Sequence, residues 1–317
     1  MTETENTNNK SIILPYQKAI FDRLCATGRA CLYTNRDKAT IGIKLRANFL
    51  LLGPSGSGKT FLAKELAMDM QVPFISVSTS DWILLGCTNR GGTSTWPTIF
   101  DFIERSIQKQ GAIIFIDELD KCYHDSNWNA FLRSEIFSLC DYRTPTNMND
   151  LDMEPIQQSR IAAAQSFLES KTMIIAGAAF QDVWDQKSRP SMGFATSKAP
   201  SETPEVADLI KILPRELINR FSADLFILPE VTEIDYCRMV DTVASRIPEV
   251  WRGKFLELGH ARIAEAVANR KGARYMEEIM LAAIIEERGS LANFIPPLAP
   301  PDVIEVVRCD EPGLSVF

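Results

Sequence analysis

The sequence has little or nothing of several features that mark particular classes of protein. No apolar run approaches the roughly 18 residues that a membrane-spanning helix needs. The opening segment MTETENTNNK is polar and acidic, without the basic and then apolar order of a signal peptide. These absences predict a cytoplasmic protein with no membrane association.

Metal-ligating side chains are also scarce. The chain has two histidines, His124 and His260, and its seven cysteines include no Cys-x-x-Cys pair. A structural zinc site draws three or four such ligands from short spacings. We therefore expect reduced thiols and no zinc.

The overall composition is typical of a folded globular protein. Apolar residues make up 45% of the 317 residues and charged residues 24%, close to the average of globular domains. This length predicts one large domain with a smaller one. The formal net charge of −7 disfavours a surface that coats nucleic acid, although a local basic groove is compatible with it.

Hydrophobic patterning divides the chain into three parts. Residues 1–10 are expected to form a flexible tail, and residues 11–229 alternate apolar runs with helical spacing. The apolar runs predict strands at 48–52, 72–77, 112–116, 172–176 and 224–228. Continuous apolar strands separated by helices are typical of an α/β fold with a parallel sheet covered on both faces.

The remaining segments predict a second domain and several loops. Residues 230–317 are expected to form a small, mainly helical domain. Its predicted helices are 233–247, 261–269 and 274–287, followed by a Pro-rich hinge at 296–301 and a short strand at 304–307. Two stretches rich in Pro, Ser, Thr and Asn, 143–160 and 182–210, predict long surface loops.

One segment after the first strand carries the signature of a phosphate-binding loop. It reads Gly53-Pro54-Ser55-Gly56-Ser57-Gly58-Lys59-Thr60 and opens a predicted helix. The glycines let backbone N–H groups point at phosphate oxygens, and the helix adds its positive amino end. Lys59 then contacts the β- and γ-phosphates of a nucleotide, and the Thr60 hydroxyl is a Mg²⁺ ligand.

A second motif ends a buried strand with two carboxylates. The strand Ala112-Ile113-Ile114-Phe115-Ile116 is followed by Asp117 and Glu118. Beside a phosphate loop, Asp117 holds Mg²⁺ through water and Glu118 polarises the attacking water as a general base. Together the two motifs predict hydrolysis of ATP with Mg²⁺.

Further segments, taken with these two motifs, resemble the AAA+ ATPases, and within them most closely the Clp/HslU unfoldases such as ClpX. The run 173–180 is similar to the fourth core strand and its sensor 1 turn. The segment 213–221 is similar to the arginine-finger segment, and Gly272-Ala273-Arg274 to the sensor 2 motif that opens a lid helix. No segment resembles the zinc-binding amino-terminal domain of ClpX.

The resemblance implies a three-layer AAA+ nucleotide-binding domain with a helical lid, and a homo-oligomeric ring, usually a hexamer. Arg220 would be the arginine finger that reaches the γ-phosphate of a neighbouring subunit, with Arg215 as the fallback. Arg274 would face the phosphates of its own subunit. A cation at a helix start opposes the helix dipole, which supports a phosphate-facing role for Arg274.

Two loops depart from the unfoldase pattern or match it only briefly. The segment 86–96, in the place of the substrate-gripping pore loop, has no tyrosine after its first glycine. Gripping would then fall to Trp96 or Trp82, or Arg90 would contact an acidic partner; a purely structural loop is the alternative. Met192-Gly193-Phe194 matches a tripeptide by which ClpX docks a peptidase ring.

Three functions are compatible with these motifs. The favoured one is a ring-forming ATPase that remodels or unfolds a protein partner. The second is a nucleic-acid motor or loader, suggested by Arg90 and a basic cluster consisting of Arg36, Lys38, Lys44 and Arg46, but opposed by the net charge. The third is an ATP-gated scaffold for a partner effector.

Overall fold

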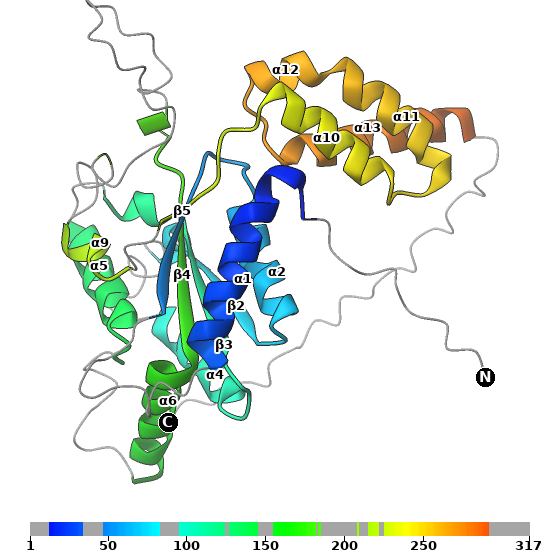
Figure 1. Ribbon diagram of the computed structural model, residues 1–317. Coiled ribbons are helices and arrows are strands. Elements are labelled where there is room, and N and C mark those ends of the chain that lie inside the picture. The colour runs from blue at the N-terminus through cyan, green and yellow to red at the C-terminus, as the bar shows by residue number, and fades with distance from the viewer. Residues whose placement is uncertain are drawn as a thin grey trace, which may run out of the picture.

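The computed structural model describes residues 13–33, 47–82, 95–123, 127–144, 155–181, 183–184, 208, 215–221 and 225–291. Five strands form one parallel sheet at its centre (Figure 1): β1 (Asn48–Leu52), β2 (Phe74–Ser78), β3 (Ala112–Asp117), β4 (Thr172–Ala178) and β5 (Leu225–Ile227). Their order across the sheet is β2-β3-β4-β1-β5. The predicted α/β fold with a parallel sheet is therefore confirmed.

The strand order places the ends of β1 and its neighbours where a ligand site is expected. β1 pairs with β4 on one side and with β5 on the other, with Leu52 opposite Ala178 and Ile227. After β1 the chain crosses to β2 at one edge of the sheet. It then comes back through β3 and β4 and passes β1 to reach β5, so the direction of the strand order reverses after β1. Ligands of open α/β sheets bind at the carboxyl ends of strands near such a point.

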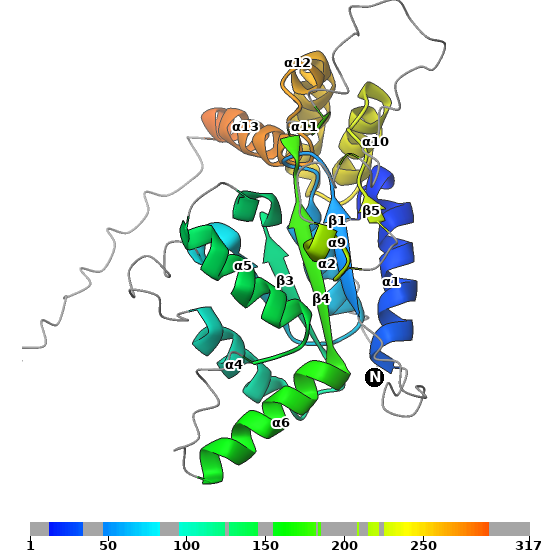
Figure 2. The same cartoon turned by 90° about the vertical axis from the view of Figure 1, so that its left-hand side faces the viewer.

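Helices cover both faces of the sheet, which explains the continuous apolar strands (Figure 2). On one face lie α1 (Lys18–Tyr33) and α2 (Lys59–Asp69), packed with Phe49, Leu51 and Phe115. On the other face lie α4 (Thr95–Ser106), α5 (Asn127–Cys140) and α6 (Pro155–Lys171). Alternate strand residues such as Leu50, Ile114 and Ile174 point to this second face.

A second group of helices sits above the carboxyl ends of the strands (Figure 1), here named the helical lid. It consists of α10 (Glu233–Ala244), α11 (Glu249–Ala261), α12 (Ile263–Ala268) and α13 (Arg274–Leu291). Thr232 caps α10 in a reciprocal capping box with Asp235. The lid has its own apolar core, which Leu14 from the amino-terminal segment joins.

Several predicted elements differ from the observed ones. α6 begins within the stretch 143–160 that was predicted as a loop. Pro155 stands at its first position, which is a favoured place for proline in a helix. α11 has no counterpart among the predicted helices, and its Gly253 and Gly259 lower its intrinsic helix propensity. Packing overrides that propensity, since a Cβ at Gly259 would lie 2.8 Å from Val240. The predicted tail 1–10, the hinge 296–301 and the strand 304–307 lie outside the described residues.

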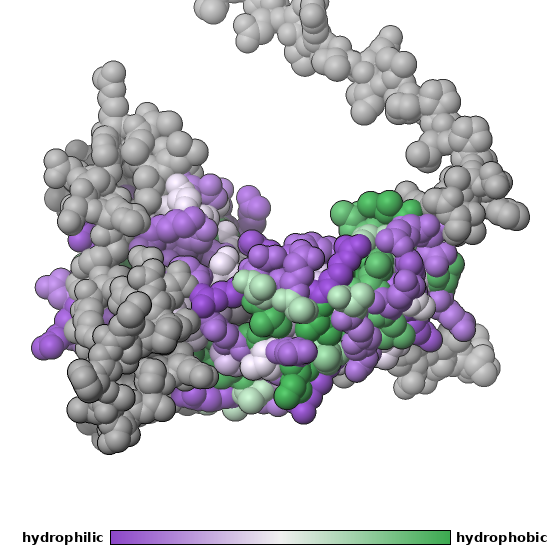
Figure 3. Space-filling model, turned by 90° about the horizontal axis from the view of Figure 1, so that it is seen from above, coloured by the Kyte–Doolittle hydropathy of each residue, from purple (hydrophilic) through white to green (hydrophobic). Residues whose placement is uncertain are grey.

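The surface of the lid mixes hydrophilic and apolar residues, as the view from above shows (Figure 3). Leu281 and Ile285, one turn apart on α13, are among the most exposed large apolar side chains. Among the helices that the structure describes, none combines the length and apolar character needed to cross a membrane.

Candidate functional site

A cavity of about 890 Å³ lies between the carboxyl ends of the strands and the helical lid. The phosphate-loop motif lines it through Ser55, Gly56, Gly58, Lys59 and Thr60, and the β3 end through Asp117 and Glu118. Arg274, from the lid, lines it as well. Segments that lie far apart in the sequence therefore meet in one site, and most of the predicted site residues are among them.

The phosphate-loop motif connects β1 to α2, as its sequence predicts. Gly53 follows the last residue of β1, and α2 begins at Lys59. Gly58 stands at the N-cap position of α2 and has no side chain with which to cap the helix. The first amide groups of a helix need partners from outside it, and this end of the helix attracts anions.

Lys59 is buried at the base of the cavity. Its Nζ donates hydrogen bonds to the carbonyl oxygens of Gly53 at 2.8 Å and Pro54 at 3.0 Å. Burial lowers the pKa of Lys59 below its ordinary value, while the nearby Asp117 and Asp120 oppose this shift. The ammonium is thus held within the loop by carbonyl acceptors that phosphate oxygens can replace.

Thr60 and Asp117 bring two oxygen ligands together. The Thr60 hydroxyl donates to Asp117 Oδ2 at 2.7 Å, and Asp117 Oδ1 accepts the N–H of Glu118 at 2.9 Å. The Thr79 hydroxyl, just after β2, donates to the main-chain oxygen of Asp117 at 2.9 Å. A hydroxyl and a carboxylate are the kind of hard oxygen ligands that suit Mg²⁺.

Glu118 has an unusual backbone conformation, and neighbours outside its own motif hold its carboxylate. Its φ of +58° lies in the left-handed region, which is costly for a residue other than glycine. Its carboxylate accepts hydrogen bonds from Lys121 Nζ at 2.6 Å and from the Ser80 hydroxyl at 2.7 Å. Lys121 and then Ser80 lower the pKa of Glu118, so its carboxylate is ionised at neutral pH and able to accept a proton.

The turn after β4, predicted as the sensor 1 position, is tied to the residues after β3. Asp120 accepts the N–H groups of Ala179 at 3.1 Å and Phe180 at 3.4 Å. Phe180 has a φ of +47° and a buried side chain. Ala179 and Gln181 line the same cavity as Asp117 and Glu118.

The lid contacts the phosphate-loop motif directly. The N–H of Ala273 donates to the Gly56 carbonyl at 2.8 Å. Arg274 follows at once as the first residue of α13, and its Cδ lies 3.8 Å from the position that a Cβ on Gly56 would occupy. The positive charge of Arg274 also contributes to the lowered pKa of Lys59. The structure thus places Arg274 beside the phosphate-loop motif, as its sequence position suggests.

Sequence reasoning missed the contribution of the amino-terminal segment. Gln17, in the short helix η2 (Pro15–Gln17), is fully buried, and its amide donates to the Ser57 carbonyl at 2.9 Å. The Tyr16 hydroxyl donates to the same oxygen, also at 2.9 Å. A polar residue after the apolar run Ile13-Leu14 was the only available signal. These contacts fix the peptide plane at Ser57, within the motif.

Arg220 does not line the cavity. It follows the short helix α9 (Arg215–Ile218), and its carbonyl accepts a hydrogen bond from Asn48 Nδ2 at 2.8 Å, at the end of β1 opposite the phosphate-loop motif. Its guanidinium donates to Asp141 Oδ2 from Nε at 3.2 Å and from Nη2 at 3.1 Å. The guanidinium also stacks on the Phe137 ring, 4.3 Å from its centroid. Arg215, by contrast, is exposed.

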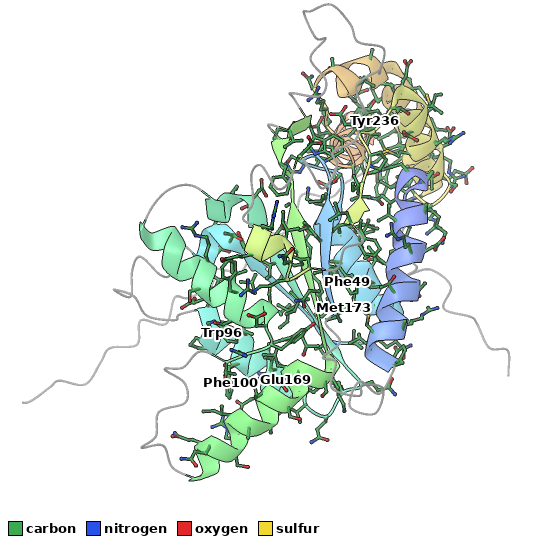
Figure 4. The ribbon with its side chains drawn as sticks, turned by 60° about the vertical axis from the view of Figure 1, so that its left-hand side comes forward. Phe49, Trp96, Phe100, Glu169, Met173 and Tyr236 are labelled. Carbon is green, nitrogen blue, oxygen red and sulfur yellow. The ribbon has the colours of Figure 1, made fainter. Side chains whose placement is uncertain are left out.

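The structure contradicts the expectation that Trp96 or Trp82 grips a substrate. Trp96 is 0% exposed and Trp82 2% exposed, and both belong to the core under the sheet (Figure 4 labels Trp96). Trp82 donates through its indole N–H to Glu135 on α5. Both indole rings pack inward because burying their large apolar area is more favourable than exposing it. Arg90 and Met192-Gly193-Phe194 lie outside the described residues.

Comparison with known proteins agrees with this geometry. Residues 49–180 match the family model described as "ATPase family associated with various cellular activities (AAA)". Similar segments occur in proteins named ATP-dependent zinc metalloprotease FtsH. The one from Clostridium perfringens is 38% identical over 89 residues, which is 28% of this chain and 12% of the relative. Those from Acaryochloris marina (42% over 85 residues) and Pelodictyon phaeoclathratiforme (40% over 88) cover 26% and 27% of this chain.

The fold and the site agree with this match: residues 49–180 are similar to the ATPase domain of the AAA family, which supports ATP hydrolysis by this chain. The chain covers only 12% of the length of these FtsH relatives, so their other properties do not follow from the match. The expected likeness to ClpX is not confirmed, since FtsH belongs to a different branch of the AAA+ proteins.

Proposed function

We propose that this chain is a ring-forming ATPase that couples ATP hydrolysis to the remodelling of a protein partner. One observation carries the proposal. A single cavity joins the phosphate-loop motif, the Asp117 and Glu118 carboxylates, and Arg274 from the lid. This arrangement supplies a phosphate cradle, a base and a second cation, which together are the parts needed for phosphoryl transfer to water.

Within the cavity each residue has a distinct role. Lys59 and the amino end of α2 bind the β- and γ-phosphates. Glu118 accepts a proton from the attacking water, and Lys121 and Ser80 keep its carboxylate ionised and oriented. Arg274 binds the phosphates from the lid side. A lid that contacts the nucleotide is the element that converts a change of bound phosphate into movement.

Mg²⁺ fits the residues present. Thr60 and Asp117, whose side-chain oxygens lie 2.7 Å apart, would hold it. When bound, it neutralises phosphate charge and orients the γ-phosphate.

Zinc, which the name of the FtsH relatives includes, does not fit in the same way. Among the described residues, no group of three or more His, Cys, Asp and Glu side chains is arranged to hold a metal ion. Residues 49–180 match the AAA ATPase family.

The protein-remodelling part of the proposal predicts selective stimulation of turnover. A permanently unfolded polypeptide added to the assembled protein is expected to raise the ATPase rate several-fold, since a remodelling ring hydrolyses faster while it works on a substrate. Duplex DNA and a stably folded protein of similar charge serve as controls. Stimulation by DNA alone would favour the nucleic-acid motor instead. Its suggested basic cluster, Arg36 to Arg46, and Arg90 lie outside the described residues.

The ring predicts a residue that acts on the neighbouring subunit. Arg220 lies away from the cavity of its own subunit. Asp141 and Phe137 hold its guanidinium in one position there. An Arg220→Ala chain and a Lys59→Ala chain are each expected to be inactive. Their mixture should recover part of the activity, because some interfaces combine an intact site with an intact Arg220. Steady-state hydrolysis across a titration of the two chains measures this.

Two controls make the mixing experiment decisive. A chain carrying both substitutions should rescue neither single variant. Arg215→Ala, tested in the same way, shows whether the exposed arginine acts in trans instead. If co-assembled Arg220→Ala and Lys59→Ala chains give no rescue, Arg220 is a structural residue that ties α9 to α5 through Asp141.

A further inference from the structure

Two glycines from distant parts of the chain face each other where the lid meets the phosphate-loop motif. Gly56 has a φ of +78° and Gly272 a φ of +61°, both in the left-handed region that favours glycine. A Cβ on Gly272 would lie 2.6 Å from the Gly56 oxygen, and a Cβ on Gly56 would lie 2.8 Å from the Lys271 oxygen. The two backbones are therefore in direct contact, with no space for side chains between them.

This contact orients a peptide group inside the phosphate-loop motif. The Gly56 carbonyl accepts the Ala273 N–H at 2.8 Å, while the Ser57 N–H on the same peptide donates to Pro54 at 3.2 Å. A planar trans peptide directs its C=O and N–H to opposite sides. The turn 271–273 of the lid thus holds one side of the loop, and Arg274 extends from the end of this turn.

A buried tyrosine of the lid, Tyr236, holds the turn 271–273 in place. The Tyr236 hydroxyl, on α10, accepts the N–H of Gly272 at 2.7 Å and donates to the Ala266 carbonyl at 3.3 Å. Tyr236 is 1% exposed and packs edge to face on Tyr275, with ring centroids 5.3 Å apart. Figure 4 shows Tyr236 within the helical lid. Burial raises the pKa of Tyr236, so the hydroxyl stays protonated and can both donate and accept.

We propose that Tyr236 is a positioning residue of the nucleotide site. Its hydroxyl holds the turn 271–273 against the Gly56 carbonyl, and thereby sets both the shape of the phosphate-loop motif and the position of Arg274. Tyr236 is not among the residues that line the nucleotide cavity. The proposal rests on the nucleotide-binding function proposed above, and adds to it a residue through which the packing of the lid controls phosphate binding.

The consequence of removing the hydroxyl follows from the geometry. Phenylalanine keeps the ring and its contact with Tyr275, but leaves the Gly272 N–H and the Ala266 carbonyl without this partner. A buried N–H without an acceptor is costly, so the turn moves to reach water and gives up its fit on Gly56. The lid-closed arrangement is then less populated before nucleotide binds, which weakens apparent affinity.

The chain offers a matched control in Tyr275. It is also 1% exposed, and its hydroxyl donates to the Gly259 carbonyl at 2.5 Å, entirely within the lid. Tyr236→Phe and Tyr275→Phe each remove one buried hydroxyl from the same apolar core. They differ in whether that hydroxyl holds the turn on the phosphate-loop motif.

The test measures nucleotide affinity, turnover and amide exchange in the full chain. Tyr236→Phe is expected to weaken ATP binding about five- to tenfold, the scale of one lost hydrogen bond, and to raise KM with little change in kcat. Exchange of the 271–273 and 56–57 amides should accelerate. Tyr275→Phe should leave affinity and exchange at 56–57 unchanged, although both variants lower the melting temperature.

A second variant keeps the proposal testable if Tyr236→Phe folds poorly. Gly272→Ala leaves Tyr236 in place but puts a methyl group against Gly56, so it should weaken ATP binding at least as strongly as Tyr236→Phe. Equal affinities for wild type and Tyr236→Phe, or equal losses in the two tyrosine variants, would overturn the proposal. If wild type itself does not bind ATP, the proposed function fails instead.

Discussion

Replacing Glu118 with Gln is expected to leave ATP bound while hydrolysis slows by about two orders of magnitude or more, the scale of losing a positioned general base. Glutamine matches glutamate in shape, and its amide oxygen can still accept the Ser80 hydroxyl, now 2.7 Å from the carboxylate. What is lost is the negative charge that accepts a proton. Calorimetric ATP affinity and single-turnover hydrolysis separate the two effects.

Glu277 supplies the control for this experiment. It also lines the cavity, but from α13 on the lid, and it is exposed. Glu277→Gln should change turnover by no more than about twofold, since surface charges contribute little. The Glu118→Gln chain is also expected to accumulate as a stable, ATP-loaded assembly. Hydrolysis at near wild-type rate with intact binding would mean that another group is the base.

Lys59→Ala is expected to abolish detectable nucleotide binding, with affinity weakened by about 100-fold or more. Charge-assisted hydrogen bonds to phosphate are among the stronger polar interactions, and the buried ammonium makes two hydrogen bonds within the loop that phosphate oxygens can replace. Titration calorimetry with ATP and Mg²⁺ measures the loss.

Lys64, an exposed lysine one turn further along α2, provides the matched variant. Lys64→Ala should bind ATP like the wild type. A melting curve of each variant separates loss of the site from loss of the fold. Unchanged affinity in a folded Lys59→Ala chain would contradict the assignment of residues 53–60 as the phosphate-binding loop.

Much of the sheet and the central site could be predicted from the sequence because their signals are local. The strand 48–52 and the helix starting at Lys59 have the predicted bounds or nearly so. Asp117 ends the buried strand β3 and Glu118 follows it, and the parallel sheet brings this carboxyl end of β3 beside that of β2. Such strands and motifs are determined by residues that are close together in the sequence, so a local pattern is enough to predict them.

The remaining features depend on contacts between distant residues. Gln17 binds the Ser57 carbonyl and Ser80 binds Glu118, but neither residue stands in a recognisable motif. Trp96 was expected at a surface because it follows a run of Gly, Thr and Ser, whereas α4 turns it fully into the core. α11 likewise forms in spite of two glycines, through packing that no local pattern reveals.

The contact between Gly56 and Gly272 also has a consequence for biosynthesis. The phosphate-loop motif leaves the ribosome together with its partners Tyr16 and Gln17, but the turn 271–273 that completes its other side is translated more than 200 residues later. A nascent chain that has folded its sheet therefore has the motif without its support from the lid. ATP should stabilise a chain that includes the lid far more than such an intermediate, because only a chain with both parts forms the binding site from both sides.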